Sequence, residues 1–181
     1  MVEKVVERSK EPEPSELLYE FSFKYRAEYR RQRAEGAIII KDKDAPWEQN
    51  RQGYLKHYCH PKFWTQQAVP YWYVFRNRIR THSGKHRHQG GLGIFVLEGK
   101  GYTVVDGVRY DWEKDDLILL PVKPEGCEHQ HFNTDPSGQP AEWLAFIFSQ
   151  FRDALGDATE QREVSPDWKG GGPVAPIAHM A

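Results

Sequence analysis

Residues 84–99 read Gly84-Lys85-His86-Arg87-His88-Gln89-Gly90-Gly91-Leu92-Gly93-Ile94-Phe95-Val96-Leu97-Glu98-Gly99, with two histidines one residue apart just before an apolar run. In an extended strand, residues i and i+2 point to the same face. His86 and His88 can therefore present two imidazoles to one point in space. Neutral imidazole binds zinc, copper, iron and nickel, so the pair indicates a metal site without naming the metal.

A second stretch repeats this pattern further along the chain. Residues 124–133 read Pro124-Glu125-Gly126-Cys127-Glu128-His129-Gln130-His131-Phe132-Asn133. An isolated His-x-His is weak evidence for a metal. Here both motifs fall at the edges of strand-like runs with hairpin signals between them, which favours one shared metal site over a coincidental cluster of histidines.

Composition limits the classes of function that need considering. The 181 residues are long enough for one domain with a real core, and the net charge of −1 gives no electrostatic case for a nucleic-acid or membrane partner. Two cysteines are too few for a disulfide framework. No segment is apolar enough to span a bilayer, and the first residues lack a signal-peptide core, so we expect a cytoplasmic protein.

The N-terminal part predicts one amphipathic helix, over residues 15–34, after a charged arm at 1–14. Ser15 is a suitable N-cap, Gly36 a suitable stop, and apolar side chains recur at helical spacing at Leu18, Phe21, Tyr25 and Tyr29. Residues 37–40 predict a short strand, and 46–69 an irregular segment. His57 and His60 lie in that segment, without the second ligand pair that a zinc knuckle needs.

The remaining chain is typical of a small β-barrel. Apolar or alternating runs bounded by turn residues predict strands at 71–79, 93–97, 101–105, 108–110, 117–121 and 142–148. Seven or eight short strands with regular turns indicate a barrel or double-sheet jelly roll. We therefore divide the chain into an N-terminal arm, helix and irregular extension (1–69), a barrel (70–150) and a polar C-terminal tail (151–181).

Both histidine stretches resemble the motifs of the cupin superfamily. The first motif of that family begins with a glycine, followed after five residues by His-x-His. A glutamate comes three or four residues later, and a second glycine follows after six more. His86, His88 and Gly99 reproduce this frame, but Leu92 stands where the glutamate is expected. The second motif, Pro-x-Gly-x-x-His-x-x-x-Asn, is matched from Pro124 to Asn133. The resemblance covers about residues 70–150 and implies an all-β cupin double-stranded β-helix (a jelly-roll barrel) with an N-terminal helical extension.

The missing glutamate implies a site of three histidines, His86, His88 and His129, without a carboxylate. Among cupins this pattern resembles the gentisate 1,2-dioxygenase and 1-hydroxy-2-naphthoate dioxygenase group, which are ferrous ring-cleaving enzymes. The segments 97–107 and 129–133 are similar to that group as well. Its members are usually bicupins of about twice this length, and three-histidine cupins also include diketone-cleaving and thiol dioxygenases and some lyases.

The resemblance thus implies a non-heme iron dioxygenase that cleaves a small aromatic hydroxy acid, such as gentisate or salicylate, with O2. Three neutral ligands leave a divalent ion with net positive charge, which favours an anionic, chelating substrate. Fe(II) is the expected metal, with Mn, Ni, Cu or Zn as alternatives. An O2-independent lyase, decarboxylase or isomerase and a non-catalytic small-ligand-binding cupin are the competing hypotheses.

Three further residues are candidates for catalysis. His131 would share a strand face with His129 and could be an alternate ligand or an acid–base group. Arg76, Arg78 and Arg80 alternate on one strand, and we select Arg80 as a clamp for a substrate carboxylate, although solvent-facing arginines would give the same pattern. Gln89 is a candidate hydrogen-bonding partner beside the site. The resemblance also implies a homodimer.

Overall fold

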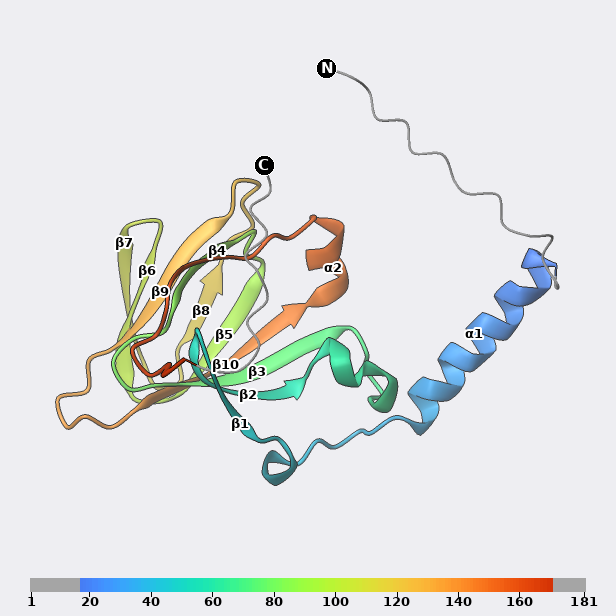
Figure 1. The fold of residues 1–181 in the computed structure, drawn as a ribbon, viewed down its shortest axis with the longest axis horizontal. Coiled ribbons are helices and arrows are strands. Elements are labelled where there is room, and N and C mark those ends of the chain that lie inside the picture. Colours follow the sequence, from blue (N-terminus) through green and yellow to red (C-terminus); the bar gives the residue numbers. More distant parts are fainter. Residues whose placement is uncertain (1–16, 171–181) are drawn as a thin grey trace, which may run out of the picture.

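The computed structural model describes residues 17–170. Two antiparallel sheets make up the body of the protein (Figure 1). The six-stranded sheet contains, in spatial order, β1 (Trp47–Asn50), β2 (Gly53–Cys59), β3 (Trp72–Ile79), β10 (Ala141–Phe148), β5 (Leu92–Glu98) and β8 (Leu117–Leu120). The five-stranded sheet contains β11 (Glu160–Glu163), β4 (Lys85–His88), β9 (Cys127–Asn133), β6 (Lys100–Val105) and β7 (Val108–Glu113).

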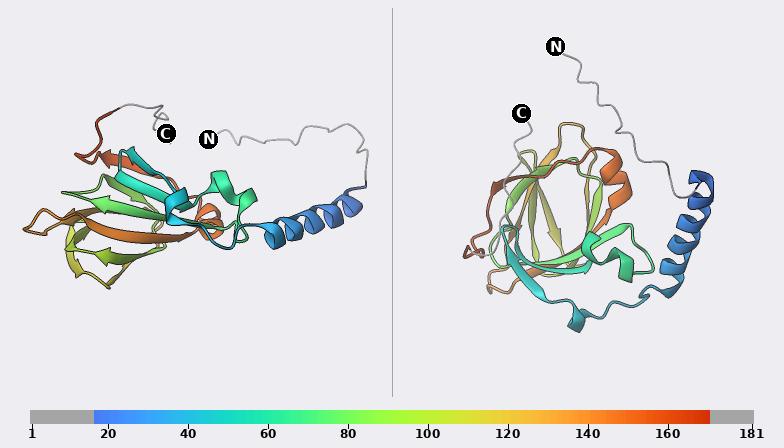
Figure 2. Two further views of the ribbon diagram at one scale, coloured as in Figure 1. Left: turned by 90° about the horizontal axis from the view of Figure 1, so that it is seen from below. Right: turned by 45° about the vertical axis from the view of Figure 1, so that its right-hand side comes forward.

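The two sheets face each other and enclose the core, as the right-hand view of Figure 2 shows. Alternate residues of β5 and β10 point inward, including Ile94, Val96, Trp143, Ala145 and Ile147, all of which are buried. Because side chains alternate across a strand, one face of each strand supplies the core. The predicted all-β barrel with an N-terminal helix is confirmed.

The segment 46–69, expected to be irregular, was wrongly assigned. It forms β1, β2 and the 3-10 helix η2 (Pro61–Gln66). β2 pairs along β3, with His57 opposite Phe75, so its extended conformation depends on a neighbour distant in sequence. Its pattern is obscured because Lys56 is buried and forms an ion pair with Asp42 in the short helix η1 (Asp42–Asp44).

The strand expected at 37–40 does not form. Ala37 makes a single bridge to Gln67, while Ile38 and Ile39 are exposed, because no strand offers a partner there. At the other end, residues expected to be a polar tail form α2 (Ser149–Ala154) and β11, which pairs with β4. The sheets therefore extend on both sides of the expected barrel range 70–150. The expected arm at 1–14, the cap Ser15 and the last residues of the tail lie outside the described range.

The N-terminal helix α1 (Leu18–Glu35) agrees closely with the predicted range, but it has no buried residue. Leu17 is at its N-cap and provides no side-chain hydrogen bond. Gly36 ends the helix with φ −66°, so a left-handed turn is not the reason for glycine here. A Cβ at this position would lie 2.4 Å from the Gln67 carbonyl carbon, so the close approach of two backbones requires it. No helix among residues 17–170 is long and apolar enough to cross a membrane.

Candidate metal centre

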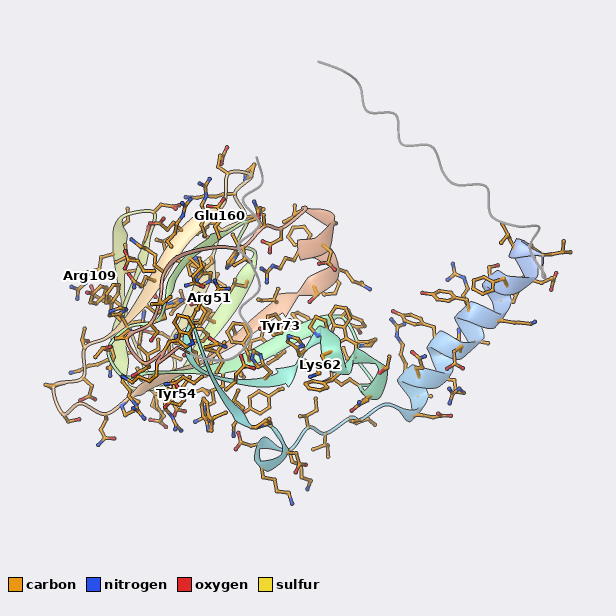
Figure 3. All side chains as sticks on the ribbon, in the orientation of Figure 1. Arg51, Tyr54, Lys62, Tyr73, Arg109 and Glu160 are labelled. Carbon is orange, nitrogen blue, oxygen red and sulfur yellow. The ribbon has the colours of Figure 1, made fainter. Side chains whose placement is uncertain are left out.

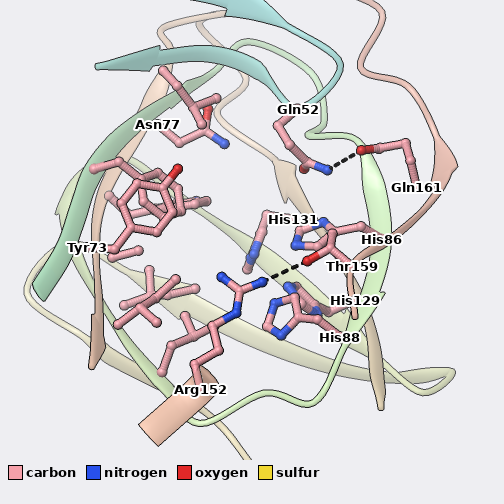
Figure 4. A pocket seen from close by; sticks show the side chains of 17 residues that line it. Gln52, Tyr73, Asn77, His86, His88, His129, His131, Arg152, Thr159 and Gln161 are labelled. Atoms are coloured by element: carbon pink, nitrogen blue, oxygen red, sulfur yellow. Dashed lines mark hydrogen bonds between the residues drawn. The ribbon is translucent and has the colours of Figure 1, made fainter. Parts of the chain in front are cut away.

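The three histidines of the two motifs meet on adjacent strands. His86 and His88 lie on β4 and His129 on β9, with His86 directly opposite His129 in the register. One ligand nitrogen from each lies within 4.8 Å of the other two. The ring centroids are 4.2 Å apart for His86 and His129, and 4.8 Å apart for His88 and His129 (Figure 4). The i, i+2 spacing and one strand pairing are sufficient to assemble the group.

These histidines line an interior cavity of about 230 Å³. The opposite wall comes from the six-stranded sheet and is mostly apolar; it includes Tyr73, Phe75, Ile94, Trp143 and Ile147. Tyr73 lies across the cavity from the histidines in Figure 4. The cavity therefore has one nitrogen-rich wall and one wall suited to an apolar or aromatic body.

All three imidazoles are held in the neutral form. Burial lowers the pKa of His88 to about 3, with further contributions from His129 and Arg152. Burial likewise lowers the pKa of His129 to about 4 and holds that of His86 well below its ordinary value. Because a metal binds the deprotonated nitrogen, the site needs no proton release near neutral pH.

Hydrogen bonds to the rings decide which nitrogen can serve as a ligand. His129 Nδ1 donates to the Cys127 carbonyl at 3.0 Å, which leaves the lone pair on Nε2. His88 Nδ1 accepts from the Gly90 amide at 2.9 Å, and Asp157 Oδ1 lies 3.9 Å from the same atom. For His88 Nε2 to bind a metal, the ring hydrogen would have to move to Nδ1. That change would end the hydrogen bond from Gly90 and require Nδ1 to approach Asp157 as its new acceptor.

The third ring has a free buried nitrogen. His86 Nδ1 is buried and makes no hydrogen bond of ordinary geometry among the described residues, although the Gly84 backbone near this ring opposes part of the lowering of its pKa. An unsatisfied buried nitrogen is costly unless something binds it. Three neutral imidazoles, one with an unpaired buried nitrogen, therefore fit a divalent transition metal.

His131 occupies a different position from these three. It is fully buried on β9 and lines the same cavity, but it is outside the group whose nitrogens converge. Its Nδ1 lies 2.7 Å from Thr103 Oγ1, which accepts a hydrogen bond from Trp112 Nε1 at 2.9 Å. The described residues offer the Thr103 hydroxyl no other acceptor, so we assign its hydrogen to the bond with His131 Nδ1, which leaves the ring hydrogen of His131 on Nε2. His131 is thus a hydrogen-bond donor, and the alternate-ligand expectation is not supported by this tautomer.

A cavity residue absent from the sequence-based candidates is Arg152, on α2. Its guanidinium points into the cavity close to His88 and His129 (Figure 4). It forms an ion pair with Asp157 and donates to Thr159 Oγ1 at 2.7 Å. In sequence, Arg152 begins the polar segment after the last strand, and nothing in that segment indicates that it returns to the barrel.

The structure places the arginine and glutamine candidates elsewhere. Arg80 is exposed over the Tyr54 ring, 5.0 Å from its centroid, and does not line the cavity, so its assignment as a clamp was wrong. Arg76 and Arg78 are on the outer face of β3, where both form ion pairs with Glu142. Gln89 also lies outside the cavity lining; its amide oxygen accepts from the Ala158 backbone amide and so anchors the loop that carries Asp157.

Comparison with known proteins agrees with this architecture. Residues 79–147 match the cupin domain family. Salicylate 1,2-dioxygenase from Pseudoaminobacter salicylatoxidans, solved with gentisate, is 19% identical with a TM-score of 0.50, covering 78% of this chain and 36% of that chain. The chain therefore spans about a third of the length of that dioxygenase.

A second similar structure is matched over almost its whole length. Pac13 of Streptomyces, a nucleoside dehydratase solved with uridine, is 12% identical with a TM-score of 0.50, covering 72% of this chain and 95% of that chain. At these sequence identities, the similarity is evidence for the fold alone. No curated protein sequence matches the chain.

Proposed function

Since the chain carries a cupin domain over residues 79–147, we propose that it is a metal-dependent enzyme of the dioxygenase type, acting on a small aromatic hydroxy acid with O2. His86, His88 and His129 would hold the metal, for which Fe(II) is the first candidate. A ferrous ion there would supply a positively charged template for a chelating substrate and the electrons for reaction with O2.

One observation carries this proposal: the side chain of Arg152 and three neutral imidazoles line the same cavity. The charge of Arg152 is close enough to help lower the pKa of both His88 and His129. No carboxylate lines this cavity among the described residues. Arg152 already pairs with Asp157 through Nε, so an anionic ligand would chiefly offset the charge of the metal, while the remaining N–H groups of the guanidinium are suited to bind its carboxylate.

The size and lining of the cavity support a single-ring substrate. About 230 Å³ is smaller than the roughly 300–1,000 Å³ typical of sites for drug-sized ligands. Phe75, Ile94 and Trp143 provide an apolar surface against which a ring can pack. His131, with its hydrogen on Nε2, would donate to a substrate oxygen and so orient the ring between Arg152 and the three histidines.

A second candidate is an O2-independent lyase or dehydratase. The observation that favours it is His131, a buried acid–base group in the same cavity as the three histidines. In such a reaction the Nε2–H of His131 would donate a hydrogen bond to the leaving oxygen and so stabilise its developing charge. The dehydratase with a similar fold is matched over 95% of its own length, so a single barrel accommodates that chemistry in another protein.

Oxygen uptake by the iron-reconstituted protein separates these functions. The substrates would be gentisate, salicylate, 1-hydroxy-2-naphthoate, catechol and a β-diketone, with iron content measured on the same samples. Uptake together with loss of aromatic absorbance is the expected result. Protein that holds iron stoichiometrically but consumes no oxygen with any of these compounds would contradict the dioxygenase proposal and favour the lyase.

A further inference from the structure

Helix α1 has an apolar surface that no other part of residues 17–170 covers. Leu18, Phe21 and Tyr25 are 63%, 54% and 60% exposed, and with Tyr29 they form one stripe along the helix. Phe21 stacks on Tyr25, and Tyr25 stacks on Tyr29, with centroids 6.4 and 6.1 Å apart. Figure 3 shows the side chains of α1 projecting into open space with no strand beside them.

A helix in this situation needs a partner for its stability. Most helical stability in proteins comes from tertiary packing of one face, and isolated helices of this length are marginal in water. The contacts that join α1 to the barrel lie at its C-terminal end: Arg33 lies over the Tyr71 ring, and Ala37 bonds to the backbone next to Gln67. Most of the stripe is therefore left for another molecule.

The outer face of the six-stranded sheet is a matching surface. On β8, Leu117 and Leu119 are 60% and 70% exposed, and Phe95, Phe146 and Phe148 on the next strands are 37–40% exposed. The register places Leu117 beside Phe95, and Leu119 beside Gly93, whose other neighbour is Phe146. These side chains form one continuous apolar face on neighbouring strands, which soluble monomers seldom leave exposed.

The same face continues past the edge of its sheet. Leu117 and Leu119 also line a groove of about 580 Å³ together with Val108 and Tyr110 from β7. Val108 and Tyr110 are more than half exposed. The apolar region on this side of the barrel therefore offers both a flat face and a groove at its border.

We propose that α1 of one chain packs on this outer sheet face of a second copy, with the reciprocal contact made by the second copy. An α-helix of 18 residues is about 27 Å long, and a strand of eight residues such as β10 is about 26 Å long, so the helix covers the face along its strands. In both views of Figure 2 α1 leads away from its own barrel, so its stripe is accessible to a second copy.

Charge and area agree with a second copy as the partner. The helix carries five basic and three acidic residues, whereas Glu113, Asp115 and Asp116 border the β8 end of the sheet face. Aromatic side chains bury roughly 150–250 Å² each when fully covered. Each helix would cover Leu18, Phe21 and Tyr25, and each sheet the exposed parts of its three phenylalanines and two leucines. Two reciprocal contacts of this kind reach the ~1,200 Å² at which specific interfaces begin. A twofold arrangement also closes the assembly and leaves neither surface exposed.

The test is the mass of the full-length protein in solution, measured by light scattering over a concentration series. We expect twice the chain mass for the wild type. Phe21→Glu on the helix and Leu119→Glu on the sheet should each weaken dimerisation by at least roughly 30-fold, the loss expected for one central contact of about 2 kcal/mol. Ala27→Glu adds the same charge to the opposite face of α1 and should leave the dimer intact.

Three results would overturn the proposal. The first is a wild type that stays monomeric at about 100 µM; sedimentation of that monomer with anionic lipid vesicles would then assign the stripe to a membrane surface. The second is a dimer that survives both charge substitutions. The third is a dimer lost with Phe21→Glu but kept with Leu119→Glu, which would place the helix on another surface. Leu119 is largely exposed, so its variant should keep the wild-type circular dichroism and thereby exclude misfolding.

Discussion

Thr103 Oγ1 lies 2.7 Å from His131 Nδ1, and both side chains are fully shielded from solvent. The hydroxyl also accepts the Trp112 indole N–H and has no other acceptor among the described residues, so we assign its own hydrogen to His131. This arrangement keeps the other imidazole nitrogen protonated inside the cavity. The site thereby combines three imidazoles that can accept a metal with a fourth that donates a hydrogen bond.

Replacing Thr103 by Val should remove the hydrogen bond that fixes the tautomer of His131 while leaving the metal ligands in place. We expect metal content to stay stoichiometric and turnover to fall about tenfold or more, since one positioned donor contributes on that order. Two buried polar groups would lose their partner, which costs about 1–3 kcal/mol each in stability. Thr134→Val, at an exposed position, is the matched control. Unchanged ¹⁵N chemical shifts of the His131 ring in the Thr103 variant would contradict the tautomer assignment.

Arg152→Gln tests the anion-binding role. Loss of the guanidinium should raise KM for an aromatic acid by tenfold or more, with a smaller change in kcat, because a charge-assisted hydrogen bond contributes about 1.5–3 kcal/mol. Arg80→Gln removes the same group from the exposed surface and should leave KM unchanged. Binding of salicylate to the metal-free protein, followed by tryptophan fluorescence, provides a measurement independent of turnover. Equal affinity for salicylate in the wild type and the Arg152 variant would contradict the proposed anion-binding role of Arg152.

The metal-free protein should lose stability as pH falls below about 6.5. The folded-state pKa values of His88 and His129, about 3 and about 4, lie below the ordinary value of 6.5. The unfolded chain therefore binds more protons in this window, and each such histidine lowers the free energy of unfolding by up to about 1.4 kcal/mol per pH unit. Urea unfolding at pH 7, 6 and 5 measures the slope. His129→Asn should give a shallower slope, and a slope that does not change would show that His129 does not contribute.

Much of the barrel could be predicted because its central strands carry their own signal. β3, β5 and β10 alternate or run apolar between turn residues, so their extended conformation is encoded locally. The metal-site candidates followed from the same local rule, since His86 and His88 needed only a strand to share a face. Their meeting with His129 came from the family resemblance, and the strand register is the physical reason for it.

The peripheral strands and the cavity arginine could not be predicted in this way. β2 and β11 are extended because they pair with β3 and β4, which their own polar sequences do not reveal. Arg80 and Arg152 look equivalent in sequence, and only the return of the chain through α2 brings one of them into the barrel. Such long-range pairing overrides local propensity.

Glu142 should be one of the most sensitive charged positions of the sheet. Its side chain is only 9% exposed and is bound by both Arg76 and Arg78. Removing one member of a buried ion-pair network leaves uncompensated charge, so Glu142→Gln should lower the free energy of unfolding by about 1–3 kcal/mol. Glu98 is opposite Glu142 in the register but is exposed and pairs with Lys114, so Glu98→Gln should have little effect. Equal denaturation midpoints for the two variants would contradict the prediction.

Gly90 lies two residues after His88, where the chain passes close to the backbone of Pro121. It has φ +79°, and a Cβ there would lie 2.0 Å from the Pro121 carbonyl oxygen. Gly90→Ala therefore forces the backbone to move, and with it the turn that directly follows His88 on β4. We expect a loss of stability of at least about 1 kcal/mol, from the strained conformation alone, and weaker metal retention on dialysis against a chelator. Gly138→Ala has φ +75° with open space around it, so it should show the strain without the loss of metal. Equal metal retention in the two variants would mean that the position of His88 does not depend on this turn.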